Sequence, residues 1–209
     1  LQCFFKTGPG EYGEGDVFLG LTVPEQRKLA QKYVELPLDG VKELLYSKYH
    51  EHRLIGLFIL VYKYAKADNA EKQKIIEFYL RHKNRSNNWD LIDCVADKLI
   101  GRHLLDKDKS ILYQLAKSEG LWDRRISIIT TFEFIKNGKF DDTLKIAEIL
   151  LNDKHDLIQK AVGWMLREVG KRNQEAEEKF LMNHYKKMPR TMLRYAIERF
   201  DEDKKEFYL

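Results

Sequence analysis

The chain has 209 residues, of which 44% are hydrophobic and 33% are charged. This length provides a conventional hydrophobic core, so neither disulfides nor a structural metal is needed for folding. The mean hydropathy is −0.53, and no apolar stretch reaches the roughly 18 residues of a membrane-spanning helix, which excludes an integral membrane protein. The chain opens at Leu1 without a Met or a recognisable signal peptide, and we expect it to be truncated before residue 1.

The charge indicates which class of partner the chain can bind, and the cysteines indicate its cellular compartment. Lysine and arginine outnumber acidic residues by 37 to 33, and the net charge of +4 permits a polyanionic partner without requiring one. Residues 1–60 carry seven basic and eight acidic side chains, whereas residues 154–199 carry eleven basic and six acidic. We therefore expect the basic surface in the C-terminal half. Cys3 and Cys94 show no paired spacing, which is typical of a cytoplasmic protein.

Glycine and proline positions predict a loop followed by helices. Five of the twelve glycines lie in the first twenty residues, so residues 1–23 are predicted to be a glycine-rich loop. No proline occurs in residues 38–188, and nearly everything after Pro24 has helical periodicity. The sequence predicts an all-α chain of about ten to twelve helices, with those that line the concave face opening near Glu51, Trp89, Leu121, Asp156 and Pro189.

Three of the predicted helices recur at a fixed interval. Their first aspartates are Asp90, Asp123 and Asp156, each 33 residues after the last. Each aspartate suits a helix N-cap or first turn, where a carboxylate accepts unpaired backbone N–H groups. A period of this size with two helices per unit predicts an α-α superhelix of HEAT-like helix pairs, which bury their apolar stripes on one another. We expect one domain over residues 1–209.

Two apparent ligand motifs are better explained as ordinary structure. Residues 8–13 spell G-x-G-x-x-G, but no strand precedes them, and Glu11 and Glu14 would repel a pyrophosphate. His50 and His52 have no supporting cysteine or carboxylate spacing, so solvent-facing or helix-capping histidines are the simpler interpretation. We therefore expect neither a cofactor nor a metal.

Aromatic and charged side chains share helix faces at two places. Trp89 and Asp93 are four residues apart, as are Lys160 and Trp164. One interpretation is a core tryptophan with a capping carboxylate and a structural arginine. The other is a cleft where indole rings receive a flat or cationic group, an acid lies among them, and Arg125 holds an anion. Gly163 would either let a ligand approach beside Trp164 or let two helices pack closely.

The chain resembles the AlkD-type DNA alkylation repair family, whose members are bacterial DNA glycosylases built from HEAT-like repeats. The resemblance is carried by Phe-Phe-Lys-Thr-Gly-Pro-Gly-Glu-Tyr-Gly near the start of the chain and by four further strings. They are Asn-Asn-Trp-Asp-Leu-Ile-Asp at 87–93, Leu-Trp-Asp-Arg-Arg at 121–125, Lys-Ala-Val-Gly-Trp-Met-Leu-Arg-Glu at 160–168, and Met-Pro-Arg-Thr-Met-Leu-Arg-Tyr at 188–195.

The resemblance implies removal of cationic N3- or N7-alkylated purines from duplex DNA, within a groove that wraps the duplex. The family's catalytic aspartate corresponds to Asp93, its flanking tryptophans to Trp89 and Trp164, and its phosphate-holding arginine to Arg125. The family does not draw the lesion into a deep pocket, unlike most glycosylases. We expect a bacterial, cytoplasmic monomer without an obligate protein partner, associated with the nucleoid when on DNA. Charge and helix facing add four predicted DNA contacts: Lys160, Arg167, Arg190 and Arg194.

The chemistry of alkylated bases agrees with a single carboxylate. An alkylated N3 or N7 makes the base cationic, so the base departs neutral and needs little acid catalysis. Positive charge then develops on the sugar, where Asp93 would stabilise it and position water. Asp90 is better explained as a helix cap. The alternatives are a non-catalytic HEAT-like protein that binds DNA structures and, less favoured, a protein-interaction scaffold with an apolar concave surface.

Overall fold

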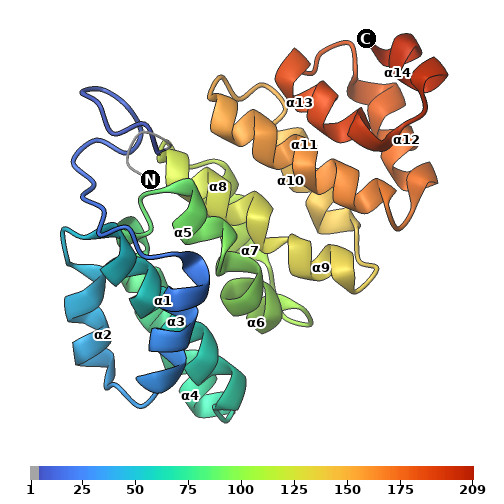
Figure 1. Cartoon of the computed structure of the whole chain (residues 1–209). Coiled ribbons are helices and arrows are strands. Elements are labelled where there is room, and N and C mark those ends of the chain that lie inside the picture. Colours follow the sequence, from blue (N-terminus) through green and yellow to red (C-terminus); the bar gives the residue numbers. More distant parts are fainter. Residues whose placement is uncertain (1–4) are drawn as a thin grey trace. The chain divides into compact units, whose positions relative to one another are not determined.

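A computed structural model describes residues 5–209 as helices joined by short loops (Figure 1). Within that range the only β pairing is an isolated parallel bridge between Val17 and Tyr49. The chain divides into two compact units, residues 1–99 and residues 100–209. None of the described helices is both long and apolar enough to cross a membrane. The predicted single domain over residues 1–209 stays a prediction.

The first unit is built around one buried helix, α3. Its residues 54–61 are almost continuously apolar and buried, because α1, α2 and α4 pack around it and α5 meets its N-terminal part. The preceding residues 7–22 form no helix. Of the predicted loop at residues 1–23, residues 1–4 lie outside the described residues and Val23 already belongs to α1. The elements of this unit are α1 (Val23–Lys32), α2 (Leu38–Leu45), α3 (His50–Lys66), α4 (Asn69–His82), a 3-10 turn (Lys83–Arg85) and α5 (Trp89–Asp93).

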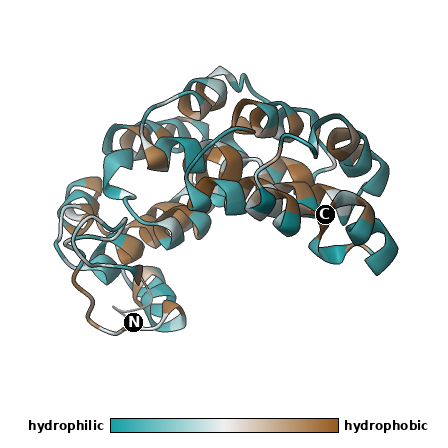
Figure 2. Cartoon of the chain, turned by 90° about the horizontal axis from the view of Figure 1, so that it is seen from above, coloured by the Kyte–Doolittle hydropathy of each residue, from teal (hydrophilic) through white to brown (hydrophobic). Residues whose placement is uncertain are grey.

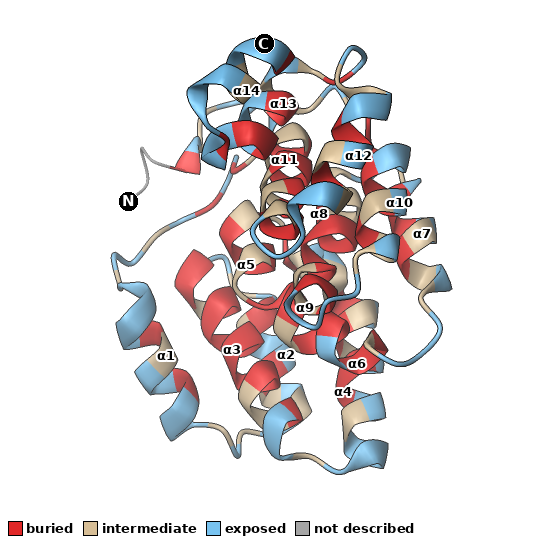
Figure 3. Cartoon of the chain, turned by 90° about the vertical axis from the view of Figure 1, so that its right-hand side faces the viewer, coloured by how far each residue is buried: buried red, intermediate tan, exposed pale blue. Residues whose placement is uncertain are grey.

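The second unit is built around α11, which packs against α8, α10, α12 and α13. Figure 3 shows that buried residues run along α11 here and along α3 in the first unit. Most helices of both units carry hydrophilic and hydrophobic residues together (Figure 2). The elements are α6 (Arg102–Leu104), α7 (Ser110–Ala116), α8 (Leu121–Thr130), α9 (Phe132–Lys136), α10 (Asp141–Ile149), α11 (Asp156–Gly170), α12 (Gln174–His184), α13 (Arg190–Ala196), a 3-10 turn (Ile197–Arg199) and α14 (Glu202–Tyr208).

The helix starts agree with those predicted, although their caps differ. Helices α3, α5, α8, α11 and α13 begin at or next to the five predicted positions; that they line a concave face stays a prediction. The caps of α5 and α11 are Asn88 and His155, whose side chains accept from Trp89 N at 2.8 Å and from Leu157 N at 3.2 Å. The N-cap role predicted for Asp90 was therefore wrong. Asp90 instead has the other role that the spacing allowed, in the first turn of α5, where its carboxylate accepts from Leu91 N at 2.9 Å.

The helix that opens at Trp89 is short. α5 ends at Asp93, and a π-helical turn follows at Asp97–Gly101. The Lys98 ammonium donates to the carbonyl of Cys94 at 2.9 Å, which satisfies a backbone acceptor where the helix stops. Such π turns inside helices are frequent at functional sites, and this one leaves Asp93 as the last residue of its segment.

Of the two roles predicted for Gly163, the structure shows close helix packing. A β-carbon built on it would lie 2.4 Å from the Met192 carbonyl and 2.5 Å from Tyr195 Cβ, both on α13. The backbone of α11 therefore approaches α13 as closely as only glycine permits.

Substituting Gly163 should destabilise the second unit. We expect Gly163→Ala to lower the free energy of unfolding by about 1–3 kcal/mol, because α13 must move to admit the methyl group. Urea unfolding followed by circular dichroism measures this. Gly120→Ala is the matched control, since its β-carbon would meet neighbours only at ordinary contact distances. Equal stability of the two variants would contradict the close packing of α11 and α13.

Candidate functional site

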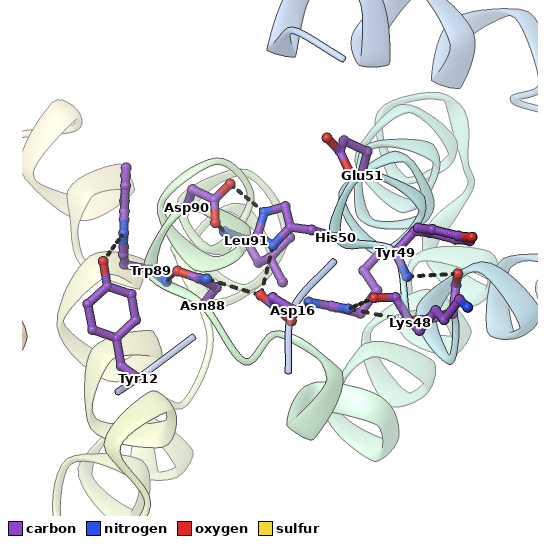
Figure 4. Close-up of polar contacts among 12 residues, drawn as sticks. Tyr12, Asp16, Lys48, Tyr49, His50, Glu51, Asn88, Trp89, Asp90 and Leu91 are labelled. Carbon is purple, nitrogen blue, oxygen red and sulfur yellow. Dashed lines mark hydrogen bonds and ion pairs between the residues drawn. The ribbon is translucent and has the colours of Figure 1, made fainter. Parts of the chain in front are cut away.

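Trp89 lies at the start of α5, half-buried, with its ring held from two sides. Its indole N–H donates to the Tyr12 hydroxyl at 3.3 Å (Figure 4). Its ring stacks on Phe5, with centroids 5.4 Å apart and planes inclined by 20°. An indole whose polar edge is satisfied and whose surface is partly open is suited to receive a flat or cationic group.

Asp93 ends the same helix, one turn after Trp89, and is also half-buried. Residues four apart project from one helix face, so this predicted pair shares a face of α5; that the two act as one site stays a prediction. The neighbouring thiol of Cys94 is a poor nucleophile. Its burial, and secondarily the nearby Asp90 carboxylate, raise its pKa to about 11, so it stays protonated at neutral pH. Of the two acids on this helix, Asp90 is buried and Asp93 is half-buried.

A buried cluster of charged residues lies behind α5. His50, at the start of α3, is 2% exposed. Its Nδ1 is 3.0 Å from the Asp16 carboxylate and its Nε2 is 2.8 Å from the Asp90 carboxylate (Figure 4). Asp16 also pairs with Arg53 and accepts from the Asn88 amide at 3.1 Å. The loop, α3 and the first turn of α5 are therefore joined by one polar network.

The network favours the charged form of both central partners. Burial opposes ionisation of Asp16, but hydrogen bonds from His50 and Asn88 and the charge of Arg53 lower its pKa below the ordinary value. Burial also opposes protonation of His50, but its bonds to Asp16 and Asp90 raise the pKa of the ring.

This cluster overturns one prediction and explains another. The expectation of a solvent-facing or capping histidine was wrong for His50, because two carboxylates that lie far away in sequence meet its ring. His52 is half-buried and its Nδ1 lies 2.9 Å from the Ser47 hydroxyl. Asp90 was misassigned as a cap because its partner could not be foreseen from local spacing. Within residues 5–209, no three metal-ligating side chains are gathered to hold an ion.

The G-x-G-x-x-G segment has no vacant backbone donors for a phosphate at its first two glycines. The Glu11 carboxylate accepts from Gly8 N at 2.8 Å, and the Glu14 carboxylate accepts from Gly10 N at 2.9 Å. These acids occupy the positions that a pyrophosphate would need. The geometry therefore supports rejection of a dinucleotide site, and the loop instead presents Tyr12 to Trp89.

Arg125 and Trp164 belong to the second unit. Arg125 on α8 is 5% exposed and donates to the Leu157 carbonyl at 2.5 Å. Trp164 on α11 is half-buried beside Phe132, with ring centroids 5.8 Å apart, and hydrogen-bonds the Glu168 carboxylate. Trp164 is thus partly open, as a substrate-facing ring requires, whereas Arg125 is more enclosed than the sequence indicated.

The four predicted DNA-contacting side chains lie on α11 and α13. Lys160 pairs with Asp156 at 2.8 Å, and Arg167 pairs with Glu198. Arg190 is exposed and donates to the Leu209 carbonyl, and Arg194 is exposed. A phosphate that binds Lys160 or Arg167 must compete with a carboxylate of the same unit, which reduces the net gain from each contact.

Several residues of the site escaped the sequence analysis. Tyr12 was passed over inside a rejected motif, and Asp16 and Arg53 gave no pattern of their own. The one feature of the sequence that could have drawn attention to the cluster is its position next to turns. Asp16 follows a group of glycines, and His50 begins a strongly apolar helix. Only the folded chain brings them together.

Comparisons with known proteins agree with the fold. It is that of an α-helical solenoid: a predicted DNA alkylation repair enzyme from Enterococcus faecalis has a TM-score of 0.70 at 15% identity, covering 91% of this chain and 92% of that chain. This likeness confirms the expected all-α solenoid fold class. The profile of the family described as DNA alkylation repair enzyme matches residues 1–200, so the chain belongs to that family. No curated protein matches the chain.

The contact between Trp89 and Tyr12 is directly testable. In Tyr12→Phe we expect the indole N–H resonance of Trp89 to move upfield in proton NMR, because the N–H loses its acceptor. The free energy of unfolding should fall by about 0.5–1.5 kcal/mol. Tyr33→Phe is the control, because Tyr33 is exposed on the same unit. An unchanged Trp89 resonance in Tyr12→Phe would disprove the contact.

Proposed function

We propose that this DNA alkylation repair enzyme is a DNA glycosylase, which excises N3- or N7-alkylated purines from duplex DNA by hydrolysis of the N-glycosidic bond. The observation that carries the proposal is the pairing of half-buried Trp89 and Asp93 on one face of α5. A carboxylate one turn from an open indole can act on a cationic group that rests against the ring. The family membership supports a role in alkylation repair.

The proposed mechanism assigns Asp93 to the charge that develops on the sugar. The alkylated base is already cationic and leaves as a neutral purine, so the chain need not supply a strong general acid. As the bond breaks, the deoxyribose acquires oxocarbenium character. The Asp93 carboxylate stabilises that charge and orients the water that attacks the anomeric carbon. The water gives its oxygen to the sugar, and its proton goes to Asp93 or to solvent.

The two tryptophans are assigned to the sugar and the lesion. Their ring faces favour a nearby cation by about 0.5–2 kcal/mol each. Trp89 is supported in this role by its contacts with Tyr12 and Phe5, which fix the plane of its ring. Trp164 is supported by its partial exposure and its contacts with Phe132 and Glu168. No cofactor or metal takes part in the proposed reaction.

DNA binding is assigned to Arg125 and to basic side chains of α11 and α13. Arg125 would hold a phosphate beside the lesion, and Lys160, Arg167, Arg190 and Arg194 would contact the backbone. Because Arg125 is assigned to hold the DNA backbone, its substitution should weaken DNA binding and excision together. The proposed partner is duplex DNA containing alkylated purines, bound by a cytoplasmic monomer.

Removing the charge of Asp93 should separate excision from binding. We expect Asp93→Asn to lower single-turnover release of 7-methylguanine by at least about 100-fold, the usual cost of losing one such electrostatic group. The dissociation constant for the same duplex should stay equal or decrease, because a negative charge near the phosphates is gone. Release is measured by chromatography of free base, and binding by fluorescence anisotropy.

Asp39→Asn is the matched control for that experiment, because Asp39 is an exposed acid on α2 of the same unit. It should leave both quantities unchanged. If the wild-type chain binds DNA but Asp93→Asn releases base at the wild-type rate, the mechanism fails. A wild-type chain that binds DNA and releases no base would favour the non-catalytic DNA-binding alternative.

Salt dependence tests the assigned phosphate contacts. The logarithm of the DNA association constant should fall linearly with the logarithm of salt concentration, by about 0.9 per neutralised phosphate. Arg194→Ala should reduce this slope by about one contact, whereas Lys145→Ala on α10 should not. Binding that does not respond to salt would contradict backbone recognition and favour a protein scaffold.

A further inference from the structure

Two carboxylates contact the His50 ring, one at each ring nitrogen. Nδ1 faces Asp16 and Nε2 faces Asp90, at 3.0 and 2.8 Å. An ionised carboxylate only accepts hydrogen bonds, and a neutral imidazole has only one N–H donor. Both contacts are therefore satisfied only when the ring carries two protons, as an imidazolium.

The charges of the cluster balance. Asp16 and Asp90 carry one negative charge each, and His50 and Arg53 carry one positive charge each. All four residues are less than 9% exposed, so a change in one of them leaves a buried charge uncompensated. The buried acid of α3, Glu51, accepts from the backbone N–H groups of Leu19 and Gly20 at 2.8–3.0 Å.

The cluster includes hydrogen bonds to both residues that flank Trp89, Asn88 and Asp90. Asn88 donates its side-chain amide to Asp16 and caps the N–H of Trp89. Asp90 accepts from His50 through one oxygen and from Leu91 N through the other. A helix of five residues is not stable by itself, so the orientation of α5 depends on these tertiary bonds.

Ring stacking gives a second connection from His50 to Trp89. Phe18 stacks on the imidazole, with centroids 4.5 Å apart, and on Phe5 at 4.8 Å. Phe5 in turn stacks on Trp89 at 5.4 Å. Hydrogen bonds and aromatic contacts thus lead from the same side chain to the same indole.

We infer that His50 is a positioning residue of the proposed lesion site: its doubly protonated ring, held between Asp16 and Asp90, fixes the first turn of α5 and thereby the placement of Trp89 and Asp93. The catalytic consequence rests on the proposed glycosylase function, whereas the structural consequence does not. His50 makes no assigned contact with substrate, and it acts through Asp90, Asn88 and Phe5.

The inference predicts a defined dependence on pH. The folded-state pKa of His50 is raised, so its contribution to stability is complete below the ordinary value of about 6.5. The contribution is lost as pH rises through the folded-state pKa. Deprotonation removes one of the two ring donors, so either Asp16 or Asp90 loses its hydrogen bond from His50. The placement of Trp89 should change in the same pH range.

The first test is a pH titration of the wild-type chain by nitrogen-15 NMR, with no DNA present. We expect both ring nitrogens of His50 to remain protonated above pH 6.5, and the indole N–H resonance of Trp89 to shift with the same midpoint as the ring. Trp89→Phe identifies the indole resonance, and His50→Gln identifies the ring signals. A neutral His50 at pH 6, or a Trp89 resonance that is indifferent to the titration, would overturn the inference.

The second test compares His50→Gln with His52→Gln, two substitutions on one helix. Glutamine at position 50 keeps one donor and does not titrate. We expect excision by His50→Gln to fall by about 10- to 100-fold, the usual effect of misplacing a catalytic group. The dissociation constant for DNA should stay within about threefold of the wild-type value, because His50 makes no assigned contact with substrate. The decline of excision that we expect for the wild type as pH rises through the folded-state pKa of His50 should be absent from His50→Gln. His52→Gln should match the wild type throughout.

The outcomes separate this inference from the proposed function. If the wild type releases no base while the Trp89 resonance follows the titration of His50, the glycosylase proposal fails and the positioning role stands. If the wild type releases base and folded His50→Gln excises at the wild-type rate with the wild-type pH profile, the positioning role fails alone. Should His50→Gln not fold, the titration of the wild type still decides.

Discussion

The bridge from Asp16 through His50 to Asp90 joins three parts of the chain that lie far apart in sequence. Asp16 lies 34 residues before His50, and Asp90 lies 40 residues after it. The three side chains bring together the glycine-rich loop, the start of α3 and the first turn of α5. Arg53 neutralises the second negative charge. Without that balance, burial of two carboxylates would cost more than their hydrogen bonds return.

This bridge has consequences because α5 is short. Five residues include barely one turn, and a helix of that length persists only through contacts with its surroundings. Both residues next to Trp89 have their side chains in the cluster. Asp93 ends α5, and a π-helical turn begins further on at Asp97. The half-buried indole and carboxylate therefore lie on a helix that the buried cluster holds in place, as a preorganised site requires.

The sequence predicted much of the fold because local rules suffice for it. Apolar periodicity, the missing prolines between residues 38 and 188 and the 33-residue repeat of Asp90, Asp123 and Asp156 predicted helix starts that the structure has within about one residue. The glycine-rich loop followed equally from composition. The π-helical turn that follows α5 was not predicted, because residues 97–101 carry no proline or glycine break before Gly101.

The site was predictable only in its pairs at helical spacing. Trp89 and Asp93 share a face because they are four apart, and that much needs no tertiary structure. The roles of Asp16, His50 and Tyr12 depend on contacts across 34 to 77 residues, and spacing holds no record of such contacts. The same limit explains why Asp90 was mistaken for a cap and why the burial of Arg125 was unforeseen.

The most direct measurement is the stoichiometry of products from a duplex with one 7-methylguanine. The wild-type chain should release free 7-methylguanine and leave one abasic site for each base released, because hydrolysis of the N-glycosidic bond yields both together. Asp93→Asn, purified in parallel, should yield neither above the spontaneous rate. Stable binding of that duplex by the wild-type chain, with the modified base still attached to its sugar, would contradict the glycosylase assignment.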